Sequence, residues 1–315
     1  MSFMQIKDLN VHYPIRGGFF NTVVDHVYAV DGVTMEFEKG KTYGLVGESG
    51  SGKSTTGKAI IGLEKITSGT ITYEGKDVTN QRRNRNNSFN KDIQMIFQDS
   101  TSAMNPRKRI QEVLAEPIRN FMNLSPHEEK RRIIELLEIV GMSEEALLKY
   151  PHEFSGGQKQ RLGIARAVAC NPKMIIADEP VSALDLSVQA QVLNFMKDIQ
   201  TEFGLSYLFI SHDLGVVRHM CDHISIMYKG RFVETGTKQD IYENPQHIYT
   251  NRLLSAIPNI EPSTRKERKE VRQAVEAAYR VEAPKFFDAE GKVLGLKNLS
   301  STHRVAMSAL ETEAN

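Results

Sequence analysis

The chain has 315 residues, and its 40% hydrophobic and 25% charged residues are typical of a globular protein. Its 40 basic and 39 acidic side chains leave a formal net charge of +1, which argues against bulk attraction to nucleic acid or to an anionic membrane. No apolar run approaches the ~20 residues of a membrane-spanning helix.

The first ten residues lack the basic and apolar regions of a secretory signal. The two cysteines, Cys170 and Cys221, are isolated and have no metal-binding spacing, which suits a reducing compartment. We therefore expect a cytosolic protein with two packed thiols.

The N-terminal part of the chain predicts short strands followed by a helix. Residues 3–13 and 27–37 alternate apolar and polar side chains as half-buried strands do, with a loop or loose hairpin between them. Residues 41–47 form a short apolar strand that runs into a glycine-rich turn, and residues 54–63 carry a helical apolar stripe. Residues 67–79 predict another strand pair.

The middle of the chain is predicted to be mostly helical. Residues 80–92 form a polar, basic segment that we interpret as a solvated connection, because no aromatic residues are interleaved for nucleic-acid binding. Residues 93–98 form a buried strand, and the chain is helical from Ile110 to Val140, with Ser125 and Pro126 opening its second part.

From residue 174 onward strands alternate with helices, which predicts β-α-β units and a parallel sheet covered on both faces. After about Pro262 the composition shifts to a charged helix, and the last thirty residues have little apolar periodicity. We expect that tail to be either an accessory segment or partly disordered.

Residues Gly47–Thr55, GESGSGKST, match the phosphate-loop pattern G-x-x-x-x-G-K-[ST] between a predicted strand and a predicted helix. Glycines let backbone N–H groups close around phosphate oxygens, and the helix N-terminus adds partial positive charge. Lys53 is expected to reach the β- and γ-phosphates, and the Ser54 hydroxyl to ligate Mg²⁺. The residues predicted to bind the nucleotide here are Gly47, Ser49, Gly50, Gly52, Lys53, Ser54 and Thr55.

Two carboxylates end the apolar strand MIIADE at Asp178 and Glu179. The carboxyl ends of strands face the ligand in open α/β sheets, so both acids are expected near the phosphate loop. Asp178 would hold Mg²⁺, directly or through water, and Glu179 would act as general base or orient the attacking water.

Two further strands are followed by polar residues at the same sheet edge, Gln98 and His212. Gln98 could ligate Mg²⁺ and the lytic water, and His212 could hydrogen-bond the γ-phosphate. Either residue taken alone is usually incidental, but because both follow strands of a phosphate-loop sheet we expect them to be functional, an interpretation that spacing alone does not settle.

A second candidate anion site lies in HEFSGGQKQRLGIARAV, His152–Val168, where Ser-Gly-Gly-Gln begins a predicted helix. With the phosphate loop, Gln98, the carboxylates, SALD and His212 in this order, residues 3–245 resemble the ATP-binding subunits of ABC transporters. A P-loop kinase or GTPase would lack the Ser-Gly-Gly-Gln helix.

The resemblance implies an α/β fold: a P-loop NTPase with a RecA-like core sheet, an antiparallel β subdomain, an inserted helical subdomain at about 104–168 and a C-terminal extension at 246–315. The family signature is usually LSGGQ, and Phe154 stands here in the place of the leucine. The phosphate-contacting residues of the signature would be Ser155, Gly156, Gly157 and Gln158.

In this family two ATPase subunits clamp two ATP molecules head to tail, so each signature completes the partner's site. The family's D-loop falls on Ser182–Asp185. An aromatic residue of the first strand stacks on adenine, for which Tyr13 is our choice and Tyr28 the rival. The implied cofactors are ATP and Mg²⁺.

The segments IQMIFQDSTSAMNPR, YPHEFSGGQKQRLGIARA and NPQHIYTNRLLSAIP are similar to the oligopeptide and dipeptide permease branch, nearest to its F-type oligopeptide subunits. Ser100 and Ile248 replace prolines that are usual in that branch. Some members carry an iron–sulfur cluster near the C-terminus, but no cysteine follows Cys221, so none is expected here.

The branch implies an ATPase that energises oligopeptide uptake at the cytoplasmic face of the cell membrane, attached through membrane subunits. Its partners would be a paralogous ATPase subunit, two integral membrane permease subunits and an extracellular peptide-binding lipoprotein, without nucleic acid. An exporter, a dipeptide or nickel importer, and a non-transport ATPase remain alternatives. A chromosome-maintenance ATPase would separate these motifs by a long coiled coil, and a ribosome-acting ABC protein would normally carry two cassettes.

Overall fold

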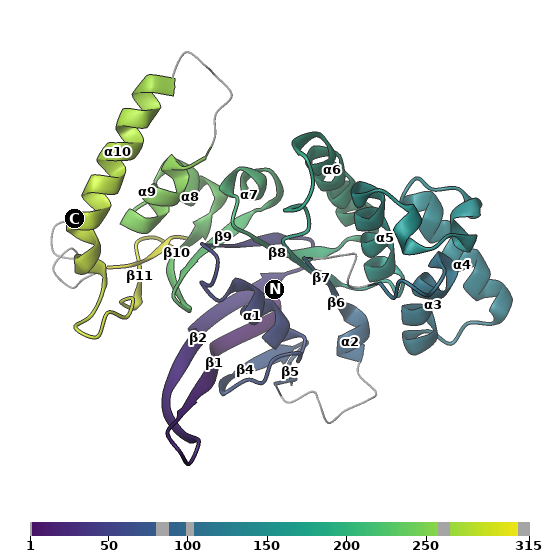
Figure 1. The fold of residues 1–315 in the computed structure, drawn as a ribbon, viewed down its shortest axis with the longest axis horizontal. Coiled ribbons are helices and arrows are strands. Elements are labelled where there is room, and N and C mark those ends of the chain that lie inside the picture. Colours follow the sequence, from purple (N-terminus) through teal and green to yellow (C-terminus); the bar gives the residue numbers. More distant parts are fainter. Residues whose placement is uncertain (1, 80–87, 99–103, 258–264, 308–315) are drawn as a thin grey trace. The chain divides into compact units, whose positions relative to one another are not determined.

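Residues 2–79, 88–98, 104–257 and 265–307 are described by the structure, a computed structural model (Figure 1). The chain divides into two compact units. One comprises Met1–Phe3, Phe37–Lys41 and Gln81–Ile210, and the other comprises Met4–Glu36, Thr42–Asn80 and Ser211–Asn315. Ser100 and most of the basic segment 80–92 lie outside the described residues.

The first unit is built on the parallel strands β6 (Ile93–Ile96), β7 (Met174–Asp178) and β8 (Ser206–Ser211). Every residue of β7 and β8 is buried, as expected for parallel strands covered on both faces. The register pairs Asp178 with Ile210, so the predicted carboxylates follow the carboxyl end of a buried strand.

Helices make up the rest of the first unit, where α5 packs against α3, α4, α6 and β6 (Figure 1). They are α2 (Ser88–Asp92), α3 (Ile110–Phe121), α4 (Pro126–Ile139), the 3₁₀ segments η2 (Glu144–Leu148) and η3 (Pro151–Glu153), α5 (Gly156–Val168) and α6 (Leu186–Phe203). The predicted helix from Ile110 to Val140 is interrupted before Ser125, which caps α4 in a reciprocal capping box with Glu128. The end of the basic segment is helix α2 rather than loop.

The second unit contains an antiparallel sheet with the strand order β2-β1-β4-β5. Its members are β1 (Ser2–Gly17), β2 (Thr22–Glu38), β4 (Ser68–Tyr73) and β5 (Lys76–Asp77). Of the two alternatives left open between residues 13 and 27, the hairpin is the one observed, because both strands continue into this segment and turn only at residues 18–21. Antiparallel strands can extend with both faces exposed, so burial periodicity does not reveal them.

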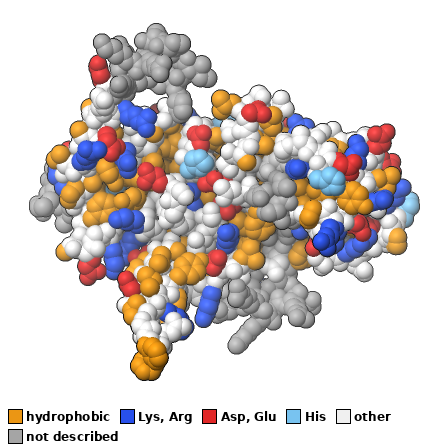
Figure 2. Space-filling model, in the orientation of Figure 1, with side chains coloured by type: hydrophobic (Ala, Val, Ile, Leu, Met, Phe, Trp, Pro, Cys, Tyr) orange, Lys and Arg blue, Asp and Glu red, His pale blue; other side chains and the backbone are white. Residues whose placement is uncertain are grey.

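The tip of this hairpin carries two apolar side chains on the surface, where Figure 2 shows hydrophobic atoms at the lower end of the molecule. Phe19 is 99% exposed and Phe20 is 85% exposed, and their rings meet edge to face with centroids 5.6 Å apart.

A mixed sheet in the second unit has the order β11-β12-β10-β9-β3. β3 (Thr42–Val46) is parallel to β9 (His223–Tyr228), and the pairs formed by β10 (Arg231–Thr237), β12 (Arg304–Ala306) and β11 (Leu296–Asn298) are antiparallel. The helices of this unit are α1 (Lys53–Ile60), α7 (Leu214–Met220), α8 (Lys238–Glu243), α9 (Ile248–Ser255), α10 (Arg265–Glu282) and the 3₁₀ segment η5 (Ala283–Phe286).

The C-terminal extension is more ordered than its composition suggested. The charged helix α10 is present and packs on α9 (Figure 1). Beyond it, β12 joins the mixed sheet and buries Val305 and Ala306 completely, so of the two alternatives for the tail an ordered accessory segment is observed up to residue 307. Strands of three residues are too short to show a periodicity in sequence. Among the described residues, no helix is long and apolar enough to cross a membrane.

Candidate nucleotide-binding site

The phosphate loop follows β3, and two of its glycines are required by close backbone contacts. A Cβ atom on Gly47 would lie 2.2 Å from the Met227 carbonyl oxygen, and one on Gly52 would lie 2.0 Å from the Ala29 carbonyl oxygen. Gly52 also has a φ of +105°, a backbone conformation that side chains rarely adopt. The loop therefore needs glycine at both positions to reach the start of α1.

Lys53 is the first residue of α1 and is only 4% exposed. Its Nζ donates hydrogen bonds of 2.8 Å to the carbonyl oxygens of Gly47 and Glu48, so the loop curls around the ammonium group. Ser54 and Thr55 follow in the first turn of the helix, half-buried, while Ser49 and Gly50 lie exposed in the loop. A positive charge held at a helix N-terminus suits a bound polyphosphate.

Of the two tyrosines considered for adenine stacking, Tyr13 lies beside the phosphate-loop helix. Its hydroxyl hydrogen-bonds Thr55 and Glu64, and burial followed by the Glu64 carboxylate raises the pKa of Tyr13. The ring of Tyr28 instead meets His12 edge to face at 4.6 Å, with the Lys292 ammonium 5.3 Å from its centroid.

Gln98 and Glu179 meet directly, although they come from different strand ends. The side-chain nitrogen of Gln98 donates a 3.0 Å hydrogen bond to Oε2 of Glu179. Glu179 has a φ of +47°, which is uncommon outside glycine, and its N–H donates to the Ile210 carbonyl at 2.9 Å. Asp178, the last residue of β7, is 3% exposed. Strained backbone of this kind concentrates at functional sites.

The signature residues begin helix α5 in a reciprocal capping box. The Ser155 hydroxyl oxygen accepts the Gln158 N–H at 3.4 Å, and the Gln158 side-chain oxygen accepts the Ser155 N–H at 3.0 Å. Because both side chains act here as acceptors, the Ser155 hydroxyl proton and the Gln158 side-chain NH₂ are the donors that the motif can offer to an anion.

The D-loop packs against this helix start. A Cβ on Gly156 would lie 3.5 Å from Cδ2 of Leu184, and one on Gly157 would lie 2.6 Å from Cγ1 of Val188. Asp185 caps α6 by accepting the Val188 N–H at 3.0 Å, and it also accepts the Ser187 hydroxyl at 2.7 Å. These hydrogen bonds lower the pKa of the Asp185 carboxyl.

His212 lies exposed in the turn after β8, just before α7. The turn is held by Asp213, whose N–H donates to Ser211 Oγ at 3.0 Å and whose carboxylate caps α7 by accepting the Gly215 N–H at 2.7 Å.

The predicted residues thus divide between the two units. The first unit brings together Gln98 and Glu179, and it also carries Asp178, the signature and the D-loop. The second unit brings Tyr13 to the phosphate loop and carries His212. No cluster of three or more His, Cys, Asp or Glu side chains with metal-ligand geometry occurs in the described ranges.

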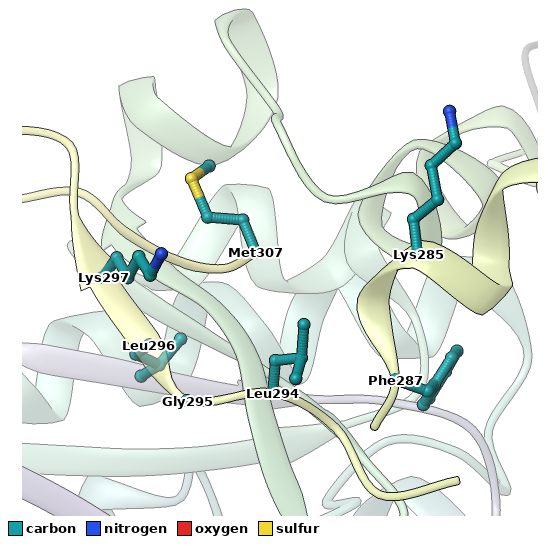
Figure 3. A pocket seen from close by; sticks show the side chains of 7 residues that line it. All are labelled: Lys285, Phe287, Leu294, Gly295, Leu296, Lys297 and Met307. Carbon is teal, nitrogen blue, oxygen red and sulfur yellow. The ribbon is translucent and has the colours of Figure 1, made fainter. Parts of the chain in front are cut away.

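A hollow of about 580 Å³ lies elsewhere, in the C-terminal extension (Figure 3). Its lining residues are Lys285, Phe287, Leu294, Gly295, Leu296, Lys297 and Met307. None of them belongs to the phosphate loop at residues 47–55.

Sequence reasoning missed a contact of the C-terminal extension with the phosphate loop. The Tyr249 hydroxyl accepts the backbone N–H of Glu48 at 3.1 Å. Tyr249 stands in the segment NPQHIYTNRLLSAIP that pointed to the permease branch, but nothing in that pattern indicates what the side chain touches.

Comparison with known proteins shows which family shares this site and fold. The family model described as ABC transporter matches residues 30–182, and the model for the C-terminal region of oligopeptide/dipeptide transporters matches residues 233–288. Among solved structures, the post-hydrolysis dimer of the ATP-binding cassette MJ0796 with ADP and phosphate is similar at a TM-score of 0.64. It is 26% identical and covers 75% of this chain and 98% of its own. The cassette cbiO1 from Clostridium perfringens is similar at a TM-score of 0.65, with 25% identity over 80% of this chain and 95% of its own.

These matches define the class as an ABC ATPase, and curated relatives give the branch. The oligopeptide transport ATP-binding protein OppF of Lactococcus lactis is 58% identical over 96% of this chain and 95% of its own. AppF of Bacillus subtilis, also an oligopeptide transport ATP-binding protein, is 48% identical over 82% of this chain and 78% of its own. The dipeptide transport ATP-binding protein DppF of Escherichia coli is 46% identical over 84% of this chain and 79% of its own. The chain belongs to the oligopeptide/dipeptide branch of the ABC transporter ATP-binding proteins.

Proposed function

We propose that this chain hydrolyses ATP to energise the uptake of oligopeptides through an ABC importer. The observation that carries the proposal is the likeness to an oligopeptide transport ATP-binding protein along nearly the whole chain, C-terminal extension included. The relative with 58% identity is an oligopeptide protein, which favours longer peptides as the cargo, although other oligopeptide relatives at 47–48% identity are nearly level with the dipeptide relative at 46%.

Lys53 would neutralise the β- and γ-phosphates of ATP, and Glu179 would accept a proton from the attacking water. The hydrogen bond from Gln98 supports this role, because it holds the Glu179 carboxylate in one orientation. His212 would hydrogen-bond the γ-phosphate, and Tyr13 would stack on adenine from its position beside Thr55.

Mg²⁺ would be held by the Ser54 hydroxyl, Asp178 and Gln98. This donor set fits the ion, because it offers only oxygen ligands. The side-chain nitrogen of Gln98 is directed to Glu179, so its amide oxygen is the atom available to a cation. When bound, the ion would draw charge from the β- and γ-phosphate oxygens.

The signature would serve the ATP of a second, paralogous subunit. Gly156 and Gly157 carry no side chains between their amides and an approaching phosphate, and Ser155 and Gln158 keep donors for it. Once the γ-phosphate is hydrolysed and leaves, these contacts are lost and the pair can open. That difference in binding free energy would drive the transport cycle.

The further partners would be two integral membrane permease subunits and an extracellular peptide-binding lipoprotein, with this chain attached at the cytoplasmic face of the membrane. Residues 1–245 would form the ABC ATPase domain, with a helical subdomain at about 104–168, and residues 246–315 would form the permease-type extension. The helices α3 to α5 support the helical assignment.

Uptake of labelled peptides of two to eight residues, in cells lacking this subunit, tests the proposal. Wild-type chain should restore uptake of oligopeptides, whereas the Lys53→Ala variant should not. Restored uptake of dipeptides alone would instead favour a dipeptide importer, and unchanged uptake of every peptide without the subunit would remove the assignment.

A further inference from the structure

The C-terminal extension touches the phosphate loop at one backbone group. The Tyr249 hydroxyl, on α9, accepts the N–H of Glu48 at 3.1 Å. On the outer side of the same residue, the Arg252 guanidinium lies 3.5 Å from the Glu48 carboxylate. The two side chains of this ion pair are 31% and 50% exposed, so solvent screens it and it contributes little, and the hydroxyl contact is the one that matters.

That N–H belongs to the peptide group whose carbonyl oxygen accepts a hydrogen bond from Lys53. The peptide group between Gly47 and Glu48 donates its N–H to the Tyr249 hydroxyl, and its carbonyl oxygen accepts a 2.8 Å hydrogen bond from Lys53 Nζ. A trans peptide is planar, with its N–H and C=O pointing in opposite directions. The hydrogen bond from this N–H to Tyr249 therefore also sets the direction in which the carbonyl oxygen points toward Lys53.

The Tyr249 side chain is itself firmly held. It is 1% exposed, its ring lies 4.7 Å from the ring of Tyr228, and the ring of Tyr279 from α10 lies 6.4 Å away. Burial is the main reason that the pKa of the Tyr249 hydroxyl is raised, so this group stays protonated and can accept from Glu48 while donating elsewhere.

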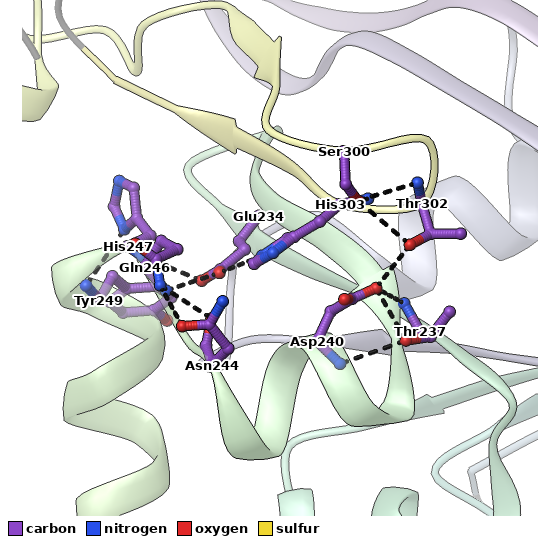
Figure 4. Close-up of polar contacts among 10 residues, drawn as sticks. All are labelled: Glu234, Thr237, Asp240, Asn244, Gln246, His247, Tyr249, Ser300, Thr302 and His303. Carbon is purple, nitrogen blue, oxygen red and sulfur yellow. Dashed lines mark hydrogen bonds and ion pairs between the residues drawn. The ribbon is translucent and has the colours of Figure 1, made fainter. Parts of the chain in front are cut away.

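The start of α9 is fixed by a buried polar network that reaches the last described strands (Figure 4). His247 caps the helix by accepting the Tyr249 N–H at 3.1 Å. Glu234 accepts the N–H groups of Gln246 and His247 at 2.8 and 3.1 Å. It also hydrogen-bonds His303 at 2.7 Å, and Glu234 and His303 are 0% and 3% exposed.

We propose that Tyr249 is a positioning residue for the phosphate loop, through which the C-terminal extension sets the affinity for the nucleotide phosphates. The hydroxyl acts on Lys53 through the Gly47–Glu48 peptide, and the network from His303 to His247 keeps α9 in place. This inference rests on the proposed use of the loop as an ATP site.

Binding of trinitrophenyl-ATP to the full chain tests it, because the added aromatic group keeps weak binding measurable. Tyr249→Phe should weaken binding about three- to tenfold, the effect of one lost hydrogen bond. Tyr242→Phe is the matched control, since it removes another part-buried hydroxyl, one that donates to the Leu214 carbonyl away from the loop. It should change affinity less than about twofold, because its hydroxyl touches nothing in the phosphate loop.

A double-mutant cycle separates positioning from general destabilisation. In the Lys53→Ala background, Tyr249→Phe should have less than about a twofold effect, because the group it positions is gone. An undiminished effect there, or equal losses from Tyr249→Phe and Tyr242→Phe, would overturn the inference. The single variant Lys53→Ala tests the ATP site itself. If this variant binds the nucleotide as tightly as the wild-type chain, the proposed function is wrong, whatever the role of Tyr249.

Discussion

Gln98 donates a 3.0 Å hydrogen bond to the Glu179 carboxylate, and Glu179 holds this position with a left-handed backbone. These two residues, 81 positions apart in the chain, are thus joined by a side-chain contact. The contact gives the carboxylate a defined orientation, as a general base requires.

Glu179→Gln should reduce phosphate release by about 10²- to 10⁴-fold, because the amide cannot accept the proton of the attacking water. ATP binding should stay within about twofold of wild type, since Gln98 can still donate to the amide oxygen. Measurements of phosphate release and of nucleotide binding by the assembled transporter check these two expectations. Near-normal release by this variant would show that Glu179 is not the base.

Gly52→Ala should disrupt the phosphate loop far more than Gly50→Ala. A Cβ at Gly52 meets the Ala29 carbonyl at 2.0 Å, whereas one at Gly50, with a φ of +78°, meets nothing within 4 Å. We expect Gly50→Ala to lower the free energy of unfolding by about 1–2 kcal/mol, and Gly52→Ala by about 3 kcal/mol or more. Urea unfolding of the nucleotide-free chain measures both, and equal losses would contradict the contact.

Ser155→Arg should abolish the ATP site whose phosphate loop belongs to the partner subunit, while leaving this chain's own nucleotide bound. The long charged side chain would stand where the signature meets phosphate. Ser125→Arg is the matched control, because Ser125 caps α4 with the same reciprocal pattern and both variants lose a cap of about 1 kcal/mol. Photolabelling with azido-ATP assigns nucleotide to each subunit. Loss only from this chain's own loop would refute the head-to-tail arrangement.

His247 should make the protein less stable in mild acid. Burial lowers its pKa from 6.5 to about 4, so between these values the unfolded chain binds a proton that the folded chain does not. The free energy of unfolding should therefore fall by up to about 1.4 kcal/mol per pH unit as the pH drops from about 6.5 to about 4.

The variant His247→Asn provides the control for this pH dependence. Asparagine can also cap α9 but does not titrate, so its unfolding free energy should depend less steeply on pH in that window. Urea unfolding at several pH values compares the two chains, and identical slopes would show that another group is responsible.

Short motifs could be predicted because their chemistry is local. The phosphate loop needs glycines and a lysine at set positions of one turn, and the cap formed by Ser155 and Gln158 joins residues only three positions apart. The long hairpin and the strand β12 could not be predicted, because an exposed ribbon and a three-residue strand leave no burial period to read.

The class of fold, the order of the motifs and the branch of the family follow from the sequence, since these depend on residues close together in the chain. Which distant groups meet follows from the tertiary structure alone. Tyr249 reaches the phosphate loop across 201 positions, and the Ala29 carbonyl forces glycine at position 52. Such contacts arise from the packing of whole elements, which no local pattern of hydrophobic and polar residues encodes.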